Sequence, residues 1–400
     1  MAGAPLAWTS VTCWRWVAEE ALAGDADVAA RWRPAMAQRV KDLPSFRASG
    51  EKPRRRVAFL RLEEGGLPSP ASDTTHSANP ADAADARGPR LAWFSGTIFD
   101  RVGDKDQLAA AVERHPELES LLPASCLLPW DADTEQGVRF PTQQNGAHED
   151  CNAAARFVLK PPLGCQGNGI EFVTTADKPR ILDIITRDAA AARAERNFLQ
   201  HLETEKGRIP SWVIQTYIPS MLIRNGRKFH VRAYVLARES PPKPAEFFVF
   251  DQFECRIACN AYQTNNYGDR GAHITNGAGG SDTDRRMLHE VPELDGQVVR
   301  NFVAALLGGT FGAELATVPE VDQRQAAQAT RLFSLCALDI MIDRSGRPWL
   351  LECNAKCPAC PPKGLGSPAF QAHLVRFMQS LIRFALLDIP GPFSPLAQTF

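Results

Sequence analysis

Residues 338–354 of this 400-residue chain read LDIMIDRSGRPWLLECN, and they decide the fold. Two apolar runs flank the segment DRSG at residues 343–346, whose polar residues and glycine are typical of a turn. Apolar runs on both sides of such a turn predict a β-hairpin. Because successive side chains of a strand alternate between its two faces, Glu352 and Asn354 point to the same face.

Carboxylates stand inside this predicted hairpin, at Asp339 on the first strand and Glu352 on the second. A buried carboxylate is costly unless it pairs with a cation or binds a metal. Together with the amide oxygen of Asn354, these hard oxygen ligands suit magnesium, which commonly bridges to nucleotide phosphates. We therefore predict a magnesium site at Asp339, Glu352 and Asn354. The alternative is that one buried acid pairs with Lys160 or Arg232.

Further strands are predicted where apolar runs are broken by glycine or polar turns. These runs read RFVLK, IEFV, SWVIQTYI, KFHVRAYVLA, EFFVF and LFSLCALDIMID, and all follow residue 155. Helical patterns occur at residues 107–122, 188–204, 298–307 and 368–387. Mostly antiparallel strands with intervening helices predict an α+β fold.

Lys160 ends the first of these strands and leads into the loop PPLGCQGNGI. Its glycines, Gly164, Gly167 and Gly169, allow the backbone to approach a ligand closely, so the lysine and the loop can form a phosphate cradle. The spacing matches neither a P-loop nor a Rossmann motif. A plain tight turn is the more frequent explanation of such glycines, and the loop alone does not decide between the two.

The strand RKFHVRAYVL places Lys228, His230 and Arg232 on one face and apolar side chains on the other. One explanation is a half-exposed strand with solvated charges. Three cations on a strand otherwise built for burial fit a polyphosphate ligand better.

The composition excludes several classes of protein. Lys plus Arg number 45 and Asp plus Glu 46, a formal charge of −1 that argues against a nucleic-acid coat. The uncharged run at residues 301–313 is too short to cross a bilayer, and no charged leader precedes an apolar segment. Ten cysteines are too dilute for a disulfide scaffold. We predict a cytoplasmic protein with no membrane or nucleic-acid partner.

Cys353, Cys357 and Cys360 have the spacing CxxxCxxC, which also occurs in proteins that hold an iron–sulfur cluster and cleave S-adenosylmethionine. Only 40 residues follow Cys360, too few for the large barrel that normally follows such a cluster loop. Strand alternation also points Cys353 away from its two polar neighbours. Buried or incidental thiols are therefore favoured.

The N-terminal region is basic, with ten basic and two acidic residues at positions 31–61. This region is either a solvated surface or a docking surface for an acidic partner. Residues 63–90 hold no aromatic residue, and Leu67 alone represents the large aliphatics, so a disordered insertion is predicted. The predicted domains are a basic region (1–62), this insertion (63–90), the remainder of an N-terminal domain (91–150) and a larger domain (151–390).

Taken in order, several pieces of the sequence resemble the tubulin tyrosine ligase-like family. They are VLKPPLGCQGNGI, VIQTYIPSMLIRNGRKFHVRAYVLA, CRIACNAYQ, HITN at residues 273–276 and ALDIMIDRSGRPWLLECNA. The resemblance covers about residues 91–385. It implies the ATP-grasp fold, in which two α+β subdomains, here about 151–235 and 236–390, grip ATP beside a smaller N-terminal α/β domain.

The resemblance also implies roles for individual residues. The ATP site would comprise Lys160, Gln166, Gly167, Asn168, Gly169, Ile170, Gln215, Thr216, Tyr217, Ile218, Lys228, His230, Thr275 and Asn276. Arg232 would contact the terminal phosphate and act in catalysis together with Lys160 and Glu352. Arg256 would bind the carboxylate of the incoming amino acid, and the polar residues of the hairpin would bind magnesium.

The implied activity is the ATP-dependent joining of tyrosine, glutamate or glycine to a protein carboxylate through an acyl phosphate. Tubulin, with its acidic tails, is the expected acceptor, and the expected location is the cytoplasm, at the cytoskeleton or a cilium. His230 stands where the family usually has aspartate, and the lysine expected after HITN is missing. A silent ATP-binding or microtubule-binding relative, or a ligase for another acceptor, are therefore the alternatives.

Overall fold

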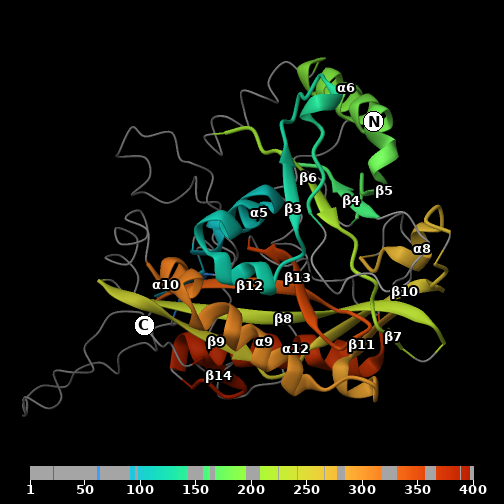
Figure 1. Cartoon of the computed structure of the whole chain (residues 1–400). Coiled ribbons are helices and arrows are strands. Elements are labelled where there is room, and N and C mark those ends of the chain that lie inside the picture. Colours follow the sequence, from blue (N-terminus) through green and yellow to red (C-terminus); the bar gives the residue numbers. More distant parts are fainter. Residues whose placement is uncertain are drawn as a thin grey trace, which may run out of the picture.

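Two largely antiparallel sheets and the helices that cover them make up the described part of the chain (Figure 1). The computed structural model describes Ala21 and residues 61–63, 91–94, 98–142, 156–162, 167–194, 208–223, 225–240, 242–264, 266–276, 284–317, 331–355, 366–387 and 389–396. The mixture of helices with mainly antiparallel strands confirms the predicted α+β class.

The larger sheet has ten strands, and its longest members lie at its centre. Its main path runs β1 (Arg61–Glu63), β2 (Leu91–Phe94), β12 (Arg331–Ile342), β8 (Arg227–Ser240), β10 (Glu254–Ala261) and β11 (Asp284–Met287). Four further strands pair beside this path: β13 (Pro348–Asn354) with β12, β7 (Leu222–Ile223) and β9 (Lys243–Phe250) with β8, and β14 (Phe393–Pro395) with β9. Of these pairs, β2 with β12 is parallel and the others are antiparallel.

The predicted hairpin at residues 338–354 is confirmed as β12 and β13. Asp343 closes the turn, because its Oδ1 accepts hydrogen bonds from the backbone N–H groups of Ser345 (2.9 Å) and Arg347 (3.0 Å). Gly346 has a φ of 87°, a conformation that favours glycine. The register shifts after the pair of Asp339 with Glu352, and this β-bulge leaves Leu351 without a cross-strand partner.

The smaller sheet has four strands in the order β3 (Ser125–Leu128), β6 (Trp212–Thr216), β4 (Phe157–Lys160) and β5 (Glu171–Val173). Helix α6 (Lys178–Ala194) packs on it through Ile181 and Ile185. Figure 1 shows this sheet and α6 standing above the larger sheet. The helix predicted at 188–204 begins earlier than predicted, at Lys178. A capping box between Thr174 and Asp177 starts the helical segment earlier, and residues 195–207 lie outside the described residues.

Helices cover the two faces of the larger sheet. Phe229 and Val231 of β8 face a core that includes α9 (Gly296–Gly308) and α10 (Thr310–Ala316). Tyr234 and Leu236 face a second core formed with α12 (Pro368–Leu387). The predictions of helices at 298–307 and 368–387 are confirmed.

Other predicted elements are shorter than expected. The helical pattern at 107–122 is α5 (Lys105–Arg114) followed by the 3-10 helix η5 (Pro116–Ser120), because Pro116 lacks the N–H that would continue α5. The remaining short helices are η4 (Ile98–Arg101), η6 (Glu135–Gly137), η7 (Thr175–Asp177), α8 (Arg270–His273) and η8 (Leu288–Glu290).

No single described helix is long and apolar enough to span a membrane. Helices α9 and α10 reach that length and composition together, but they are bent by 70°.

The segment at 91–142 contributes to both sheets, since β2 pairs with β12 and β3 pairs with β6. The domain boundaries inferred from the sequence stay predictions. Glu63, the first residue of the predicted insertion at 63–90, belongs to β1, and residues 64–90 lie outside the described residues. The same holds for the basic stretch up to residue 60.

The aromatic core beneath α12 gives a test of the packing. Phe377 is fully buried, stacks on Tyr234 at a centroid distance of 4.4 Å and meets Phe250 edge-on at 5.1 Å. We expect Phe377→Ala to lower the free energy of unfolding by about 3–5 kcal/mol, because it removes these contacts and leaves a cavity. Arg376→Ala, at an exposed position of the same helix, should change it by less than about 0.5 kcal/mol. Urea unfolding of the two variants decides, and equal effects would contradict the packing.

Candidate functional site

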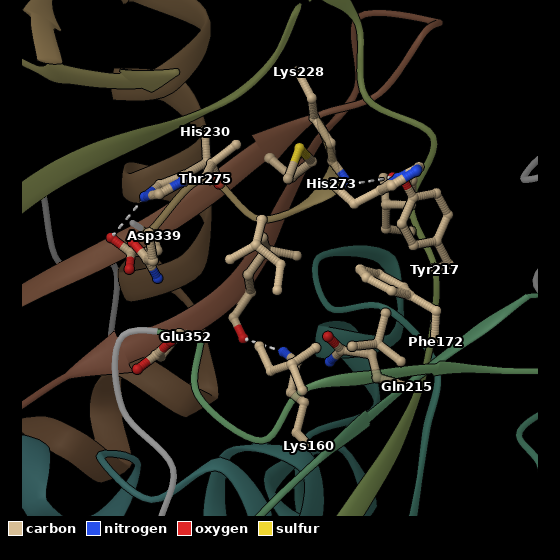
Figure 2. Close-up of a pocket in the computed structure, with 18 of the residues that line it drawn as sticks. Lys160, Phe172, Gln215, Tyr217, Lys228, His230, His273, Thr275, Asp339 and Glu352 are labelled. Carbon is tan, nitrogen blue, oxygen red and sulfur yellow. Dashed lines mark hydrogen bonds and ion pairs between the residues drawn. The ribbon is translucent and has the colours of Figure 1, made fainter. Parts of the chain in front are cut away.

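A pocket lined by residues of both sheets brings together most of the predicted site residues. Those that line it are Lys160, Gly167, Ile170, Gln215, Thr216, Tyr217, Ile218, Lys228, His230, Thr275, Asn276, Asp339 and Glu352. In Figure 2 the aromatic rings of Phe172 and Tyr217 lie at one end, and Asp339 and Glu352 lie at the other. The pocket is therefore apolar at one end and acidic at the other.

Three predicted residues do not line the pocket but bond to residues that do. Arg232 and Asn354 contact Asp339, and Arg256 Nη1 donates to Asn276 Oδ1 at 3.4 Å. The glycine-loop residues Asn168 and Gly169 do not line it, and Gln166 lies outside the described residues.

A buried ion pair at the acidic end of the pocket joins β8 to β12. Arg232 donates from Nε to Asp339 Oδ1 (2.8 Å) and from Nη2 to Oδ2 (2.9 Å), and both side chains are almost completely buried. Burial raises the pKa of Asp339, but Arg232 and His230 outweigh it and hold this pKa well below its usual range. The alternative considered for a buried acid, pairing with Arg232, is thus what Asp339 does. Asn354 Nδ2 donates to the same carboxylate at 3.1 Å.

Two buried lysines add positive charge to the pocket. Lys160 Nζ donates to the carbonyl of Leu351 at 3.2 Å, and Lys228 Nζ donates to the carbonyl of Ile218 at 3.4 Å. Burial lowers the pKa of Lys160 to about 8 against the opposing pull of Glu352. Burial and then the neighbouring Lys160 lower the pKa of Lys228 to about 7. Among the described residues neither ammonium has a carboxylate within ion-pair distance, so a polyanionic ligand would supply the missing charge.

An aromatic cluster closes the other end. The Nζ atom of Lys228 lies over the ring of Tyr217, 4.1 Å from the ring centroid. The Tyr217 hydroxyl is 2.9 Å from His273 Nδ1. His273 Nε2 lies 3.1 Å from the carbonyl of Asn266, which can only accept, so Nε2 carries the proton and Nδ1 accepts from Tyr217. Burial lowers the pKa of His273 to about 4, which keeps it in this neutral form.

Arg270 ties the glycine loop to the larger sheet. It donates to the carbonyls of Ile170 (2.5 Å) and Gly167 (2.8 Å) from α8, which follows β10. Gly167 and Gly169 have φ values of 74° and 72°, and a Cβ on Gly169 would lie 3.0 Å from Pro161. Residues 167–169 form a tight turn, and Gly167 and Ile170 also line the pocket.

The strand alternation predicted for β8 is confirmed. Lys228, His230 and Arg232 are buried on the pocket face, and the solvated-strand alternative is wrong because a second layer of structure covers them. His230 Nδ1 lies 2.5 Å from Thr275 Oγ1, and burial lowers the pKa of His230. Cys353 points away from the pocket into the core, where its Sγ is 3.1 Å from Cys336 Sγ. Cys357 and Cys360 lie outside the described residues.

The described residues fit a magnesium ion by the chemistry of their donors. Asp339 and Glu352 are cross-strand partners, and Asn354 adjoins them. Two carboxylates and an amide are the hard oxygen ligands that magnesium prefers. The described part of the chain holds no group of three or more His, Cys, Asp or Glu side chains arranged as a metal site, so the amide is needed to complete the set.

Several pocket residues were missed by the sequence analysis: Lys105, Val158, Phe172, His273, Ile274, Met341 and Leu351. His273 and Ile274 belong to the HITN motif, and Phe172 belongs to a predicted strand, so the sequence contained a signal for these three. The Leu351 carbonyl enters the site through a bulge, and Arg270 contacts residues 100 or more positions away. Neither feature has a local sequence signal.

Comparison with known proteins gives a family match over this same region. The family model described as "Tubulin-tyrosine ligase family" matches residues 105–362. A "Probable tubulin polyglutamylase ttll-9" of Caenorhabditis elegans is 26% identical over 211 residues, which are 50% of this chain and 45% of that protein. A "Probable tubulin--tyrosine ligase PBY1" of Saccharomyces cerevisiae is 24% identical over 226 residues (50% and 29%).

A third relative has another amino acid in its name. The "Tubulin glycylase 3D" of Tetrahymena thermophila is 24% identical over 177 residues, which are 40% of this chain and 16% of that protein. The chain thus spans less than half the length of each of these three relatives.

Because Lys228 is buried, its charge should make the stability of the fold depend on pH. The pKa of Lys228 falls from 10.5 to about 7 on folding, so its charge destabilises the fold below pH 7, and this cost disappears as the pH rises toward 10.5. We expect Lys228→Met to be more stable than the wild type at pH 6 by about 2–4 kcal/mol, with a smaller difference at pH 9. Urea unfolding at both pH values measures it.

The matched control is Lys243→Met, because Lys243 is exposed on β9. Its effect should be small at both pH values. A Lys228→Met protein that is less stable than the wild type at pH 6, or a stability difference that does not shrink with rising pH, would show that burial of the Lys228 charge does not destabilise the fold.

Proposed function

The chain belongs to the tubulin-tyrosine ligase family, and we propose that it is an ATP-dependent ligase that joins an amino acid to a protein carboxylate. The proposed fold of the catalytic part is the ATP-grasp fold, with ATP between the two sheets. The observation that carries the proposal is the pair of buried lysines without carboxylate partners among the described residues, in a pocket whose lining lies within the family match.

The reaction follows from the chemistry of carboxylates. A carboxylate is a poor electrophile, so amide formation in water requires its activation. In the proposed reaction a carboxylate oxygen attacks the γ-phosphorus of ATP, and the bond to ADP breaks to give an acyl phosphate. The amine of the second reactant then attacks the acyl carbon, inorganic phosphate leaves, and the amine loses a proton. No side-chain nucleophile is needed.

The proposed roles of the pocket residues follow from their charge. Lys160 and Lys228 would bind phosphate oxygens, since an anion would relieve the desolvation that lowers their pKa. Phe172 and Tyr217 would pack against the base. Arg232 is a catalytic candidate that lies behind the pocket wall, where its two hydrogen bonds to Asp339 orient it. A magnesium ion held by Asp339, Glu352 and Asn354 would neutralise phosphate charge.

The acceptor is proposed from the relatives. The names of the three relatives all include tubulin, so we propose tubulin and its acidic tails as the acceptor. That acceptor implies a cytoplasmic location, at the cytoskeleton or a cilium. The basic stretch at residues 31–61 would attract such tails electrostatically.

Mass spectrometry of tubulin tests this proposal. Purified tubulin is incubated with the protein, magnesium, ATP and a mixture of glutamate, glycine and tyrosine, and its tail peptides are weighed. We expect a mass increment of one or more amino-acid residues that depends on ATP. Glu352→Gln should abolish it, because the variant loses a carboxylate at the proposed magnesium site. No increment despite measurable ATP binding would favour a silent family member or another acceptor.

Arg270 gives a second test, as a positioning residue. Its guanidinium group donates to the loop carbonyls of Gly167 and Ile170, so we expect Arg270→Gln to raise the KM for ATP by about tenfold with a smaller change in kcat. Arg376→Gln, at an exposed position of α12, should leave both constants unchanged. An unaltered KM in Arg270→Gln would show that the contacts of Arg270 with the glycine loop do not shape the nucleotide site.

A further inference from the structure

A row of arginines crosses three neighbouring strands on the pocket face of the larger sheet. Arg256 on β10 pairs in register with His230 of β8 on one side and with Arg285 of β11 on the other. Arg232 pairs in register with Glu254, two residues before Arg256. Cross-strand partners have Cβ atoms only about 5 Å apart, so the side chains of Arg256 and Arg285 leave the same face of the sheet as neighbours.

The acids beside this row do not neutralise it. Asp339 is occupied by Arg232 through two hydrogen bonds. Glu254 is fully buried and accepts from the Tyr234 hydroxyl (2.6 Å) and from Arg256 Nη2 (3.3 Å). Within the described residues it accepts no hydrogen bond from Arg285. Among the described residues, the two carboxylates of Asp339 and Glu254 thus face three guanidinium groups, an excess of one positive charge.

Unpaired donors mark where that charge lies. Nε of Arg256 and both Nε and Nη1 of Arg285 are buried without a hydrogen-bond partner in the described structure. Burial, and then the adjacent Arg256, lower the pKa of Arg285 to about 10. Buried guanidinium N–H groups without acceptors are costly, so their presence points to an anionic ligand that accepts from them.

Arg256 connects this pair of arginines to the pocket. Arg256 reaches the pocket wall through its hydrogen bond to Asn276. The backbone of Arg285 is fixed by its pairing with β10 and by the Ser367 N–H, which donates to its carbonyl at 3.1 Å. A ligand held by both arginines would therefore lie beside the proposed nucleotide site and not within it.

On the basis of the proposed function, we propose that Arg256 and Arg285 bind the two carboxylates of a dicarboxylic amino acid, so that glutamate is the amino acid added. One carboxylate satisfies one guanidinium group, and two neighbouring groups suit two carboxylates on one small molecule. Glycine and tyrosine carry a single carboxylate and would leave the buried Nε and Nη1 donors of Arg285 without an acceptor. Arg285 is thus the residue that determines specificity.

Binding of free amino acids tests this inference directly. Titration calorimetry with magnesium and a non-hydrolysable ATP analogue compares glutamate with glutamine, glycine and tyrosine. We expect glutamate to bind at least about tenfold more tightly than the others, and Arg285→Gln to lose that preference. Arg286→Gln is the matched control, because Arg286 is the next residue, is exposed and pairs with Asp284. Thermal unfolding confirms that both variants fold.

Several outcomes would overturn the inference: no glutamate binding, equal binding of glutamine, or the same result from Arg285→Gln and Arg286→Gln. Binding of a glutamate-rich tail peptide through Arg285, without binding of free glutamate, would also overturn it, since the arginines would then serve the acceptor.

The ligation assay separates this inference from the proposed function. Glutamate that binds through Arg285 but is never joined to tubulin would support the site and contradict the proposed activity on tubulin. ATP-dependent addition of tyrosine or glycine by the wild type would support the activity and contradict the glutamate site.

Discussion

The buried ion pair between Arg232 and Asp339 is the interaction on which the rest of the site depends. It joins β8 to β12, the two longest strands of the larger sheet, at a position where both side chains are almost fully buried. Removing one member of such a pair leaves an uncompensated charge in the interior, at a cost of about 3–5 kcal/mol. The pair also fixes the carboxylate that meets Asn354 and His230, so it sets the geometry of the acidic end of the pocket.

Around this neutralised pair, the pocket carries more positive charge than its described acids balance. Lys160 and Lys228 rest on backbone carbonyls, and Arg285 has buried donors without acceptors. A fold that retains such groups gives up stability, and proteins commonly do so where a ligand supplies the missing charge. In our account two ligands neutralise this excess positive charge: a nucleoside triphosphate between the sheets and a dicarboxylic amino acid at β10 and β11.

The sequence predicted those parts of the site that depend on local pattern. Alternation along β8 placed its three cations on one face, and the hairpin motif placed Asp339 and Glu352 as neighbours, because strand geometry repeats every two residues. What it did not reveal depends on contacts between distant segments. In the sequence, Arg270 looks like an ordinary turn residue and Arg285 looks like an exposed charge. Their surroundings depend on β10, because α8 follows this strand and β11 pairs with it. The start of α6 was misplaced because alanine-rich sequence outweighed the capping residues at 174–177.

The most direct measurement of the central claim is proton uptake on ATP binding. Calorimetric titration with magnesium and ATP at pH 8, in buffers of different ionisation enthalpy, gives the number of protons taken up. Lys160 and Lys228 have pKa values of about 8 and about 7, so both are partly neutral at pH 8, and phosphate oxygens would raise these values again. The account predicts binding with an uptake of about one proton. Absence of binding, or binding without proton uptake, would contradict the claim that these buried lysines form a nucleotide site.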